Sequence, residues 1–115
     1  MKYILKGGTV VGSSVSCEAD LLIDGKKIAA VGKDLLCEGA QVVDVTGKLL
    51  FPGFIDAHTH FDLDVCNTTT ADDFASGTRS ALRGGTTMVI DFACPNKGET
   101  LGCGLALWHE KADGR

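Results

Sequence analysis

The chain has 115 residues, with 11 Lys and Arg against 15 Asp and Glu, and therefore a formal net charge of −4. Hydrophobic residues make up 44% and charged residues 23% of the sequence, which is the composition of a folded globular protein and excludes an intrinsically disordered chain. A mildly acidic chain has no electrostatic attraction to nucleic acid or to an anionic membrane surface, so we expect neither as a partner.

The termini and the cysteines indicate a cytoplasmic protein. Charges and glycines within the first eight residues leave no room for the apolar core of a signal peptide, and no window approaches the roughly 18 apolar residues of a membrane-spanning helix. The five cysteines are odd in number, widely spaced and without a C-x-x-C pair, which argues against disulfides or a zinc ribbon. We expect reduced thiols, at least four of them buried as small apolar side chains.

The first 50 residues predict short strands joined by tight turns. Turn signals occur at Gly7-Gly8, at Asp24-Gly25 and at Thr46-Gly47. The strands expected between them cover residues 3–6, 9–11, 19–23, 27–31, 41–45 and 48–50. Because two-residue turns join antiparallel neighbours, residues 1–50 are predicted to form part of a small antiparallel sheet or β-sandwich.

The pattern changes at Phe51-Pro52-Gly53, where a short apolar strand over residues 54–58 leads into a loop rich in Asp and Thr. A helix follows, with a predicted capping box in which Thr70 is the N-cap and Asp73 occupies the third helical position. Gly84-Gly85 ends it. Its apolar face is formed by Phe74, Thr78, Ala81 and Leu82.

A second strand and helix complete residues 51–115. Residues 86–92 form a nearly continuous β-branched and apolar run, typical of a parallel strand covered on both faces. Residues 100–113 predict a helix with Leu101, Leu105, Trp108 and Ala112 on one face, weakened by Gly102 and Gly104. Strand–helix–strand–helix is two β/α units of a parallel sheet. Two units cannot close a barrel, so we expect this chain to be the truncated N-terminal piece of a longer α/β protein.

The candidate metal ligands are His58 and His60 at the end of the first of these strands. Side chains two residues apart in a strand point to the same face, so both imidazoles can converge on one zinc ion, while Thr59 points away. Asp56 shares their parity and is expected one layer beneath them, either as a partner that supports the ligand rings or simply as an inward-facing polar residue. The pattern alone leaves a metal site and a structural histidine pair equally open.

Other polar residues near this pair are weaker candidates. Asp62 and Asp64 follow it in the loop, where acidic residues are usually solvated, and Cys66 is expected to be exposed nearby. The remaining histidine, His109, lies on the polar side of the second helix and is expected to be a surface residue rather than a ligand.

Residues 43–60, with the pattern P-G-x-x-D-x-H-x-H, resemble the entry of the amidohydrolase superfamily. Further motifs resemble its dihydropyrimidinase/hydantoinase family. They are Thr70-Ala71-Asp72-Asp73-Phe74, Gly77-Thr78-Arg79, Gly84-Gly85-Thr86-Thr87, Ile90-Asp91-Phe92, residues 96–101 and residues 108–112. The resemblance covers essentially the whole chain.

The resemblance implies a small β-sandwich, here residues 1–50, and a metal-dependent (β/α)₈ (TIM) barrel that begins with residues 51–115. It implies a cytoplasmic homotetramer that opens a hydantoin or dihydropyrimidine ring to the N-carbamoyl amino acid. Two zinc ions are implied, bridged by a carboxylated lysine and a hydroxide, with His58 and His60 matching two ligands of the buried ion. The lysine, the catalytic aspartate and the other ligands would lie beyond Arg115, so the resemblance assigns no catalytic or substrate-binding residue here.

Related families within the superfamily can be compared at the histidine motif and the residues that follow it. Dihydroorotases typically carry an arginine two positions after the second histidine, where this chain has Asp62, so a carboxylated ring is not expected. Dihydropyrimidinase-related structural proteins keep the fold and lose metal ligands; retention of both histidines favours the enzyme. Allantoinase stays open as a related ring-opening activity. A small β-rich domain with a chance H-x-H would leave both β/α units unexplained.

Overall fold

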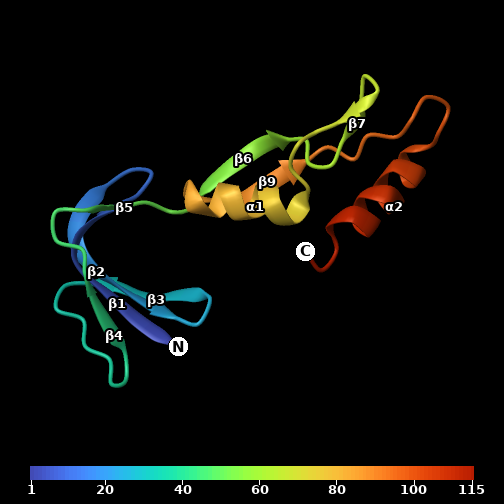
Figure 1. Cartoon of the computed structure of the whole chain (residues 1–115). Helices are drawn as coiled ribbons and strands as arrows, with labels where there is room; N and C mark the ends of the chain where they lie inside the picture. The colour runs from blue at the N-terminus through green and yellow to red at the C-terminus, as the bar shows by residue number, and fades with distance from the viewer. The chain divides into compact units, whose positions relative to one another are not determined.

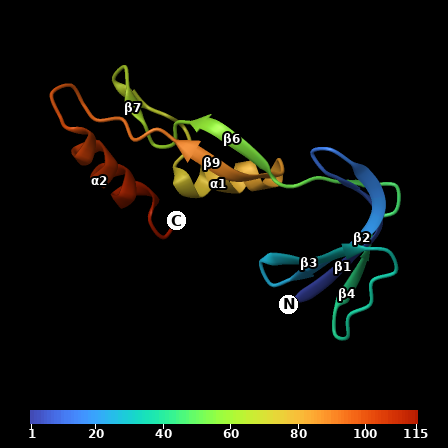
Figure 2. The same ribbon diagram turned by 180° about the vertical axis from the view of Figure 1, so that it is seen from behind.

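The computed structural model describes all 115 residues and divides into two compact units, Met1–Pro52 and Gly53–Arg115. Figures 1 and 2 show both from opposite sides. The first unit contains only strands, and the second combines strands with two helices. Each unit is described by itself below.

The first unit is a five-stranded mixed sheet. Its strands are β1 (Lys2–Val11), β2 (Ser16–Asp24), β3 (Lys27–Gly32), β4 (Gln41–Asp44) and β5 (Leu49–Leu50). Their order is β3-β2-β1-β4, and β5 also pairs with β1. The predicted hairpin at Asp24-Gly25 is confirmed: Asp24 pairs with Lys27, and Gly25 has the positive φ of 60° that such a turn requires.

The glycine pair Gly7-Gly8 is a bulge, so the turn predicted there is wrong. Strand β1 runs through both glycines, and its register against β2 shifts between Leu5 and Gly8. Gly7 has a φ of 79°, and a Cβ built on it would lie 2.7 Å from Thr46 Oγ1. Glycine is therefore required for the bend and for the close approach of the neighbouring chain, not for a reversal.

The purely antiparallel arrangement predicted for residues 1–50 is also wrong, because β4 and β5 run parallel to β1. Tyr3 pairs with Gln41 and Thr9 pairs with Leu49. Between these strands Lys48 N–H donates to the Val45 carbonyl at 2.9 Å, a tight local turn. The turn returns the chain to the same edge of β1 instead of folding β5 back on β4.

A buried carboxylate ties the bulge to the loop after β3. Asp20 is 5% exposed and accepts hydrogen bonds from Gly7 N at 2.9 Å and from Leu35 N at 3.1 Å. The bond from Gly7, and then that from Leu35, holds the pKa of this carboxyl below 3.8 against the opposing effect of its burial. Asp20 thus fixes two segments that have no ladder partner at these positions.

The second unit contains two β/α segments, as predicted. Its elements are β6 (Phe54–Thr59), β7 (Asp64–Val65), β8 (Thr68–Thr69), α1 (Phe74–Arg83), β9 (Thr86–Asp91) and α2 (Leu101–Ala112). Strands β6 and β9 pair in parallel, with Ile55 opposite Met88, and α1 is the crossover that packs on β9. Figure 1 shows the small β7–β8 hairpin beyond the end of β6.

Helix α1 begins later than predicted. Its N-cap is Asp73 and not Thr70: Asp73 Oδ1 accepts from Ser76 N at 2.7 Å, and Ser76 Oγ accepts from Asp73 N at 3.1 Å. Thr70 instead accepts from Leu63 N through its hydroxyl at 2.9 Å. The loop thus uses Thr70 to close the β7–β8 hairpin, and the helix begins after Asp73 instead. The predicted end at Gly84-Gly85 is confirmed.

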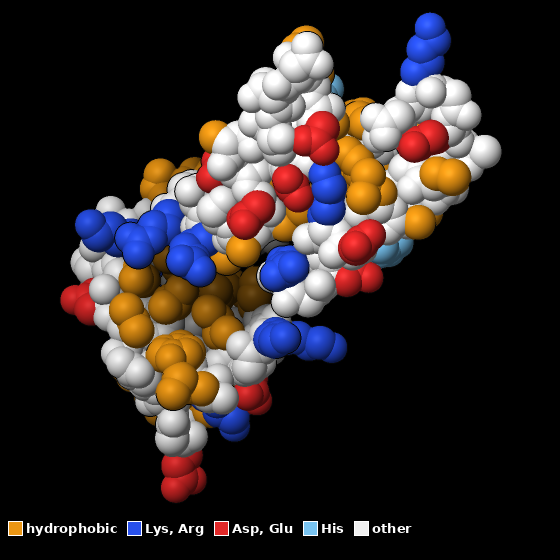
Figure 3. Space-filling view, turned by 45° about the vertical axis from the view of Figure 1, so that its right-hand side comes forward, with side chains coloured by type: hydrophobic (Ala, Val, Ile, Leu, Met, Phe, Trp, Pro, Cys, Tyr) orange, Lys and Arg blue, Asp and Glu red, His pale blue; other side chains and the backbone are white.

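The buried apolar side chains are few, namely Ile4, Ala19, Phe74 and Trp108. The expectation of buried cysteines is wrong: three of the five are exposed and two are partly exposed. The reason is that each unit is small and carries uncovered apolar faces, including Ile55, Met88, Ile90 and Phe92 in the second unit. Figure 3 shows hydrophobic side chains gathered over the strands of the first unit. Neither helix is long and apolar enough to cross a membrane.

Candidate metal centre

Two imidazoles converge at the carboxyl end of β6. His58 is the fifth residue of this strand and His60 is the first residue after it. Their Nε2 atoms lie 3.0 Å apart, with the rings nearly perpendicular at a centroid distance of 4.9 Å. The prediction that both side chains enter the same space is therefore confirmed, and its basis is the two-residue period of a strand.

The pair fits a divalent metal ion such as zinc. Two nitrogens bound to one zinc ion at ~2.0–2.1 Å lie about 2.9 Å apart at a right angle and about 3.4 Å apart at the tetrahedral angle. The observed 3.0 Å falls within this interval. Each neutral imidazole offers one nitrogen lone pair, so both rings can direct a lone pair at the same point.

An aromatic ring lies against both histidines. Phe92, directly after β9, has its ring centroid 4.3 Å from that of His58 and 5.5 Å from that of His60. Phe92 belongs to one of the motifs noted in the sequence, but the pattern alone assigns it no role. Its place beside the histidines could have been predicted, because Phe92 follows β9 as His60 follows β6, and the carboxyl ends of neighbouring parallel strands meet at one edge of a sheet.

Asp56 does not contact an imidazole. Its Oδ1 accepts a hydrogen bond from the backbone N–H of His58 at 3.2 Å. The carboxylate thus supports the backbone that carries the first histidine. A hydrogen bond from a ligand ring N–H to Asp56 remains a prediction.

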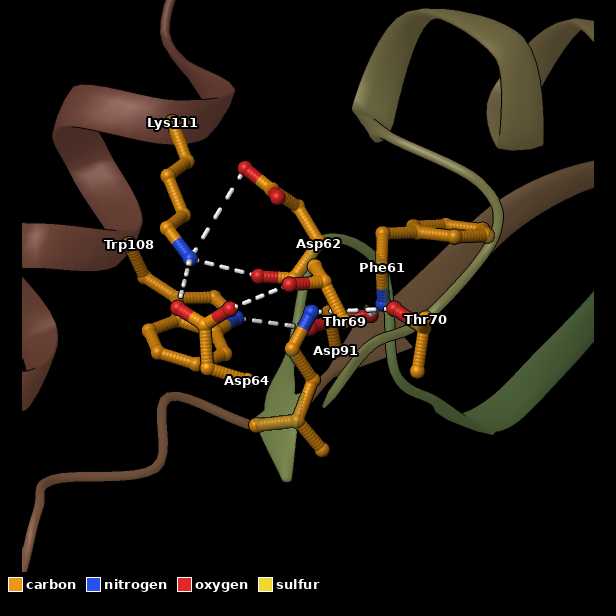
Figure 4. A network of polar contacts seen from close by, with 9 residues as sticks. Phe61, Asp62, Asp64, Thr69, Thr70, Asp91, Trp108 and Lys111 are labelled. Carbon is orange, nitrogen blue, oxygen red and sulfur yellow. Dashed lines mark hydrogen bonds and ion pairs between the residues drawn. The ribbon is translucent and has the colours of Figure 1, made fainter. Parts of the chain in front are cut away.

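A second carboxylate, that of Asp91, binds residues next to the pair, and Figure 4 shows it between Phe61 and Trp108. It accepts hydrogen bonds from Thr59 Oγ1 at 2.8 Å, from Phe61 N at 2.9 Å and from Trp108 Nε1 at 2.6 Å. Thr59 points away from the histidines, as its position in the strand predicts. The sequence motif included Asp91, but periodicity could not show that a loop and a helix would both bind it.

The loop carboxylates are paired with a lysine. Lys111 on α2 places its ammonium 3.7 Å from Asp62 Oδ2, 3.8 Å from Asp64 Oδ2 and 5.1 Å from the centre of the Trp108 ring. It also donates to the Asp62 carbonyl, as Figure 4 shows. Asp62 and Asp64 therefore hold the loop to α2. No group of three or more His, Cys, Asp or Glu side chains in the structure is arranged to hold a metal ion.

Two further sequence candidates lie at the surface. The His109 side chain is 63% exposed, with its Nδ1 atom 3.2 Å from Asp113 Oδ1 on the next turn, which confirms it as a surface residue. Cys66 is exposed between β7 and β8, as expected.

Comparison with known proteins gives a consistent result. Residues 49–101 match the profile of the amidohydrolase family. The chain is 50% identical over 115 residues to the D-hydantoinase of Geobacillus stearothermophilus, covering 100% of this chain and 24% of that protein. It is 45% identical over 102 residues to human dihydropyrimidinase-related protein 5, covering 88% of this chain and 18% of that protein. The crystal structure of dihydropyrimidinase from Brevibacillus agri superimposes with a TM-score of 0.91 at 49% identity, covering 97% of this chain and 24% of that one.

The chain is therefore similar to the amidohydrolase family. Within the family it is similar to D-hydantoinases and dihydropyrimidinases, and the resemblance stated from its motifs is confirmed. The chain spans about a quarter of the length of the curated D-hydantoinase and of the solved dihydropyrimidinase. Its mixed sheet and β/α segments match the corresponding part of those structures.

Proposed function

We propose that the protein carrying this chain hydrolyses a cyclic amide, opening a hydantoin or dihydropyrimidine ring to the N-carbamoyl amino acid. The observation that carries the proposal is the pair of imidazoles, 3.0 Å apart at the end of a parallel strand. Similarity to a D-hydantoinase over the whole chain supports the choice of substrate. A small-molecule substrate also suits a chain with a net charge of −4, which has no overall attraction to nucleic acid.

The proposal includes the architecture beyond these residues. Residues 1–50 are proposed as part of a β-sandwich, and residues 51–115 as the first two β/α units of a (β/α)₈ barrel. The parallel pairing of β6 and β9 through α1 supports this, because it repeats the unit from which such barrels are built. The histidines also lie at the carboxyl end of their strand, where barrel active sites are found.

The proposed cofactor is a pair of zinc ions, bridged by a carboxylated lysine supplied by the rest of the protein. Bound zinc supplies a hydroxide near neutral pH and polarises the scissile carbonyl. His58 and His60 would hold one ion through their Nε2 atoms. Asp56 supports the backbone of His58, and the Phe92 ring lies against both imidazoles.

A second candidate function is that of a non-catalytic assembly protein, which the similarity to dihydropyrimidinase-related protein 5 favours. Retention of both histidines argues for the enzyme instead. Allantoinase activity is a third, differing only in the ring that is opened. A carboxylated ring is disfavoured, because Asp62 presents a carboxylate paired with Lys111 rather than a free cation. We also propose a cytoplasmic homotetramer for the whole protein.

The test is metal analysis of the purified full-length protein, combined with ring-opening assays on dihydrouracil, hydantoin and allantoin. The cyclic amidase is expected to contain two zinc ions per subunit and to open the first two rings. A protein without bound metal and without turnover would support the assembly function. Turnover of allantoin alone would identify the third.

A further inference from the structure

We propose that Asp91 is a positioning residue for His60, because its carboxylate fixes the backbone on both sides of that imidazole. The proposal rests on the metal-binding function proposed above. In this proposal a side chain of β9, outside the histidine motif, determines where the His60 imidazole lies.

His60 needs such a constraint because it lies just outside the strand. Strand β6 ends at Thr59, so the ladder to β9 does not hold the next residue. Asp91 Oδ2 accepts from the hydroxyl of Thr59 at 2.8 Å and from the backbone N–H of Phe61 at 2.9 Å. One oxygen atom thus binds the residue before His60 and the residue after it.

The orientation of this carboxylate is itself fixed. Asp91 Oδ1 accepts from Trp108 Nε1 at 2.6 Å, and Trp108 is only 6% exposed. With both oxygens engaged, the carboxylate cannot rotate without breaking a bond to α2 or to the loop. Figure 4 shows Phe61 and Trp108 on either side of this carboxylate, so its donors come from two segments, the end of β6 with the loop after it, and α2.

The chemistry of the three donors requires a carboxylate. The backbone N–H of Phe61 and the indole N–H of Trp108 can only donate, and they bind different oxygens of Asp91, so both of its terminal atoms must be acceptors. An ionised carboxylate does this, and its bonds to such donors are stronger than those of a neutral amide. An asparagine would direct an NH₂ group at one of the donors and would therefore lose at least one bond.

Loss of the Asp91 carboxylate is expected to weaken metal binding. Residues that orient a ligand typically contribute about 10–100-fold to metal affinity. Release of the backbone around His60 would let its Nε2 leave the position 3.0 Å from that of His58. The effect should therefore appear in metal affinity and in ligand geometry, as well as in turnover.

The experiment uses four variants of the full-length protein, with Zn²⁺ affinity measured by chelator competition and the visible spectrum recorded for the Co²⁺-loaded form. Asp91→Asn is expected to weaken Zn²⁺ binding by roughly 10–100-fold and to alter the Co²⁺ bands. Thr59→Val, which removes one donor at nearly constant shape, should have a smaller effect in the same direction, and Thr59→Ser, which keeps the hydroxyl, should restore wild-type values. Trp108→Phe removes only the bond to α2 and should lower thermal stability more than it lowers affinity.

Two results would overturn the inference while leaving the metal site intact. One is wild-type Zn²⁺ affinity and Co²⁺ spectrum in both Asp91→Asn and Thr59→Val. The other is equal loss in Thr59→Val and Thr59→Ser, since the hydroxyl would then not matter. If Asp91→Asn does not fold, the two Thr59 variants decide. A wild-type protein that binds neither ion overturns the proposed function itself and this inference with it.

Discussion

Gly77 on α1 lies directly against the ring of Phe61, the residue that follows the second histidine. A Cβ built on Gly77 would be 2.2 Å from Phe61 Cε1, far inside van der Waals contact. The same ring packs edge-on against Phe74, at a centroid distance of 5.5 Å. Helix α1 therefore supports the loop behind the candidate metal centre, and a residue without a side chain is what allows the approach.

Gly77→Ala is therefore expected to destabilise the protein, although alanine is the better helix former. Alanine gains about 1 kcal/mol in helix propensity, whereas forcing a methyl group against a packed ring typically costs about 1–3 kcal/mol. Small shifts of the Phe61 ring cannot relieve so short a contact. We therefore expect a net loss of folding stability and a lower urea midpoint.

Gly102→Ala is the matched control on α2. The nearest side-chain atom to a Cβ built on Gly102 is Thr100 Oγ1, at 3.7 Å, an ordinary contact. This variant should therefore be stabilised by up to about 1 kcal/mol. Equal stabilisation in both variants would show that Gly77 is not a packing glycine.

His58→Ala or His60→Ala should each remove most of the metal at this site and nearly all ring-opening activity in the full-length protein. A site that loses one imidazole cannot hold the ion in place. Both histidines are exposed, and their removal leaves no buried cavity, so the thermal midpoint of the metal-free protein should change little. Normal metal content and full turnover in either variant would contradict the assignment.

Asp20→Asn tests the buried carboxylate of the first unit through pH. Since the bonds from Gly7 N and Leu35 N lower the pKa of Asp20 in the folded protein, its ionised form contributes stability above about pH 3.8. That contribution is lost as the pH falls through the lowered folded pKa. We expect the urea midpoint of the wild type to decrease when the pH is lowered below about 4. Asp20→Asn should have a lower midpoint than the wild type at pH 7, and its midpoint should change less with pH below 4.

Glu18→Gln is the control for this experiment, because Glu18 is an exposed carboxylate on the same strand. Its midpoint should follow the wild type at both pH values. A steep acid transition in Asp20→Asn, equal to that of the wild type, would assign the acid sensitivity to other carboxylates.

The elements that the sequence predicts correctly are those set by local pattern. The strand carrying His58, the continuous run of β9 and the hairpin at Asp24-Gly25 each follow from spacing or from turn chemistry, and the convergence of the histidines follows from the strand period. These features depend on neighbours along the chain.

The errors arise where a distant segment decides. Gly7 resembles a turn residue, but Asp20 and Thr46 make it part of a bulge. Thr70 has a side chain suited to an N-cap, but its hydroxyl oxygen accepts a hydrogen bond from Leu63 N–H instead. Asp91 accepts several hydrogen bonds only because the loop after β6 and helix α2 both contact it, and the periodicity of the sequence does not predict such long-range contacts.

The last prediction concerns residues 1–115 expressed alone. We expect this polypeptide to bind no binuclear metal centre and to hydrolyse nothing, because two imidazoles leave a zinc ion short of a catalytic ligand set. We also expect it to associate or to be molten. Strands β6 and β9 form a sheet of only two strands, and Ile55, Met88, Ile90 and Phe92 are each between 43% and 61% exposed on it or at its end.

The energetic argument is that covering the exposed half of each such side chain is worth ~0.7–1.5 kcal/mol, and four of them together, at about 3–6 kcal/mol, reach the lower part of the ~5–15 kcal/mol net stability of a domain. An open edge with apolar faces is in addition a template for pairing with other chains. Size-exclusion chromatography, zinc stoichiometry and a dihydrouracil assay check this directly. A soluble monomer with two zinc ions and measurable turnover would show that the remaining ligands and the cover for these strands are not needed, and would overturn the barrel proposal.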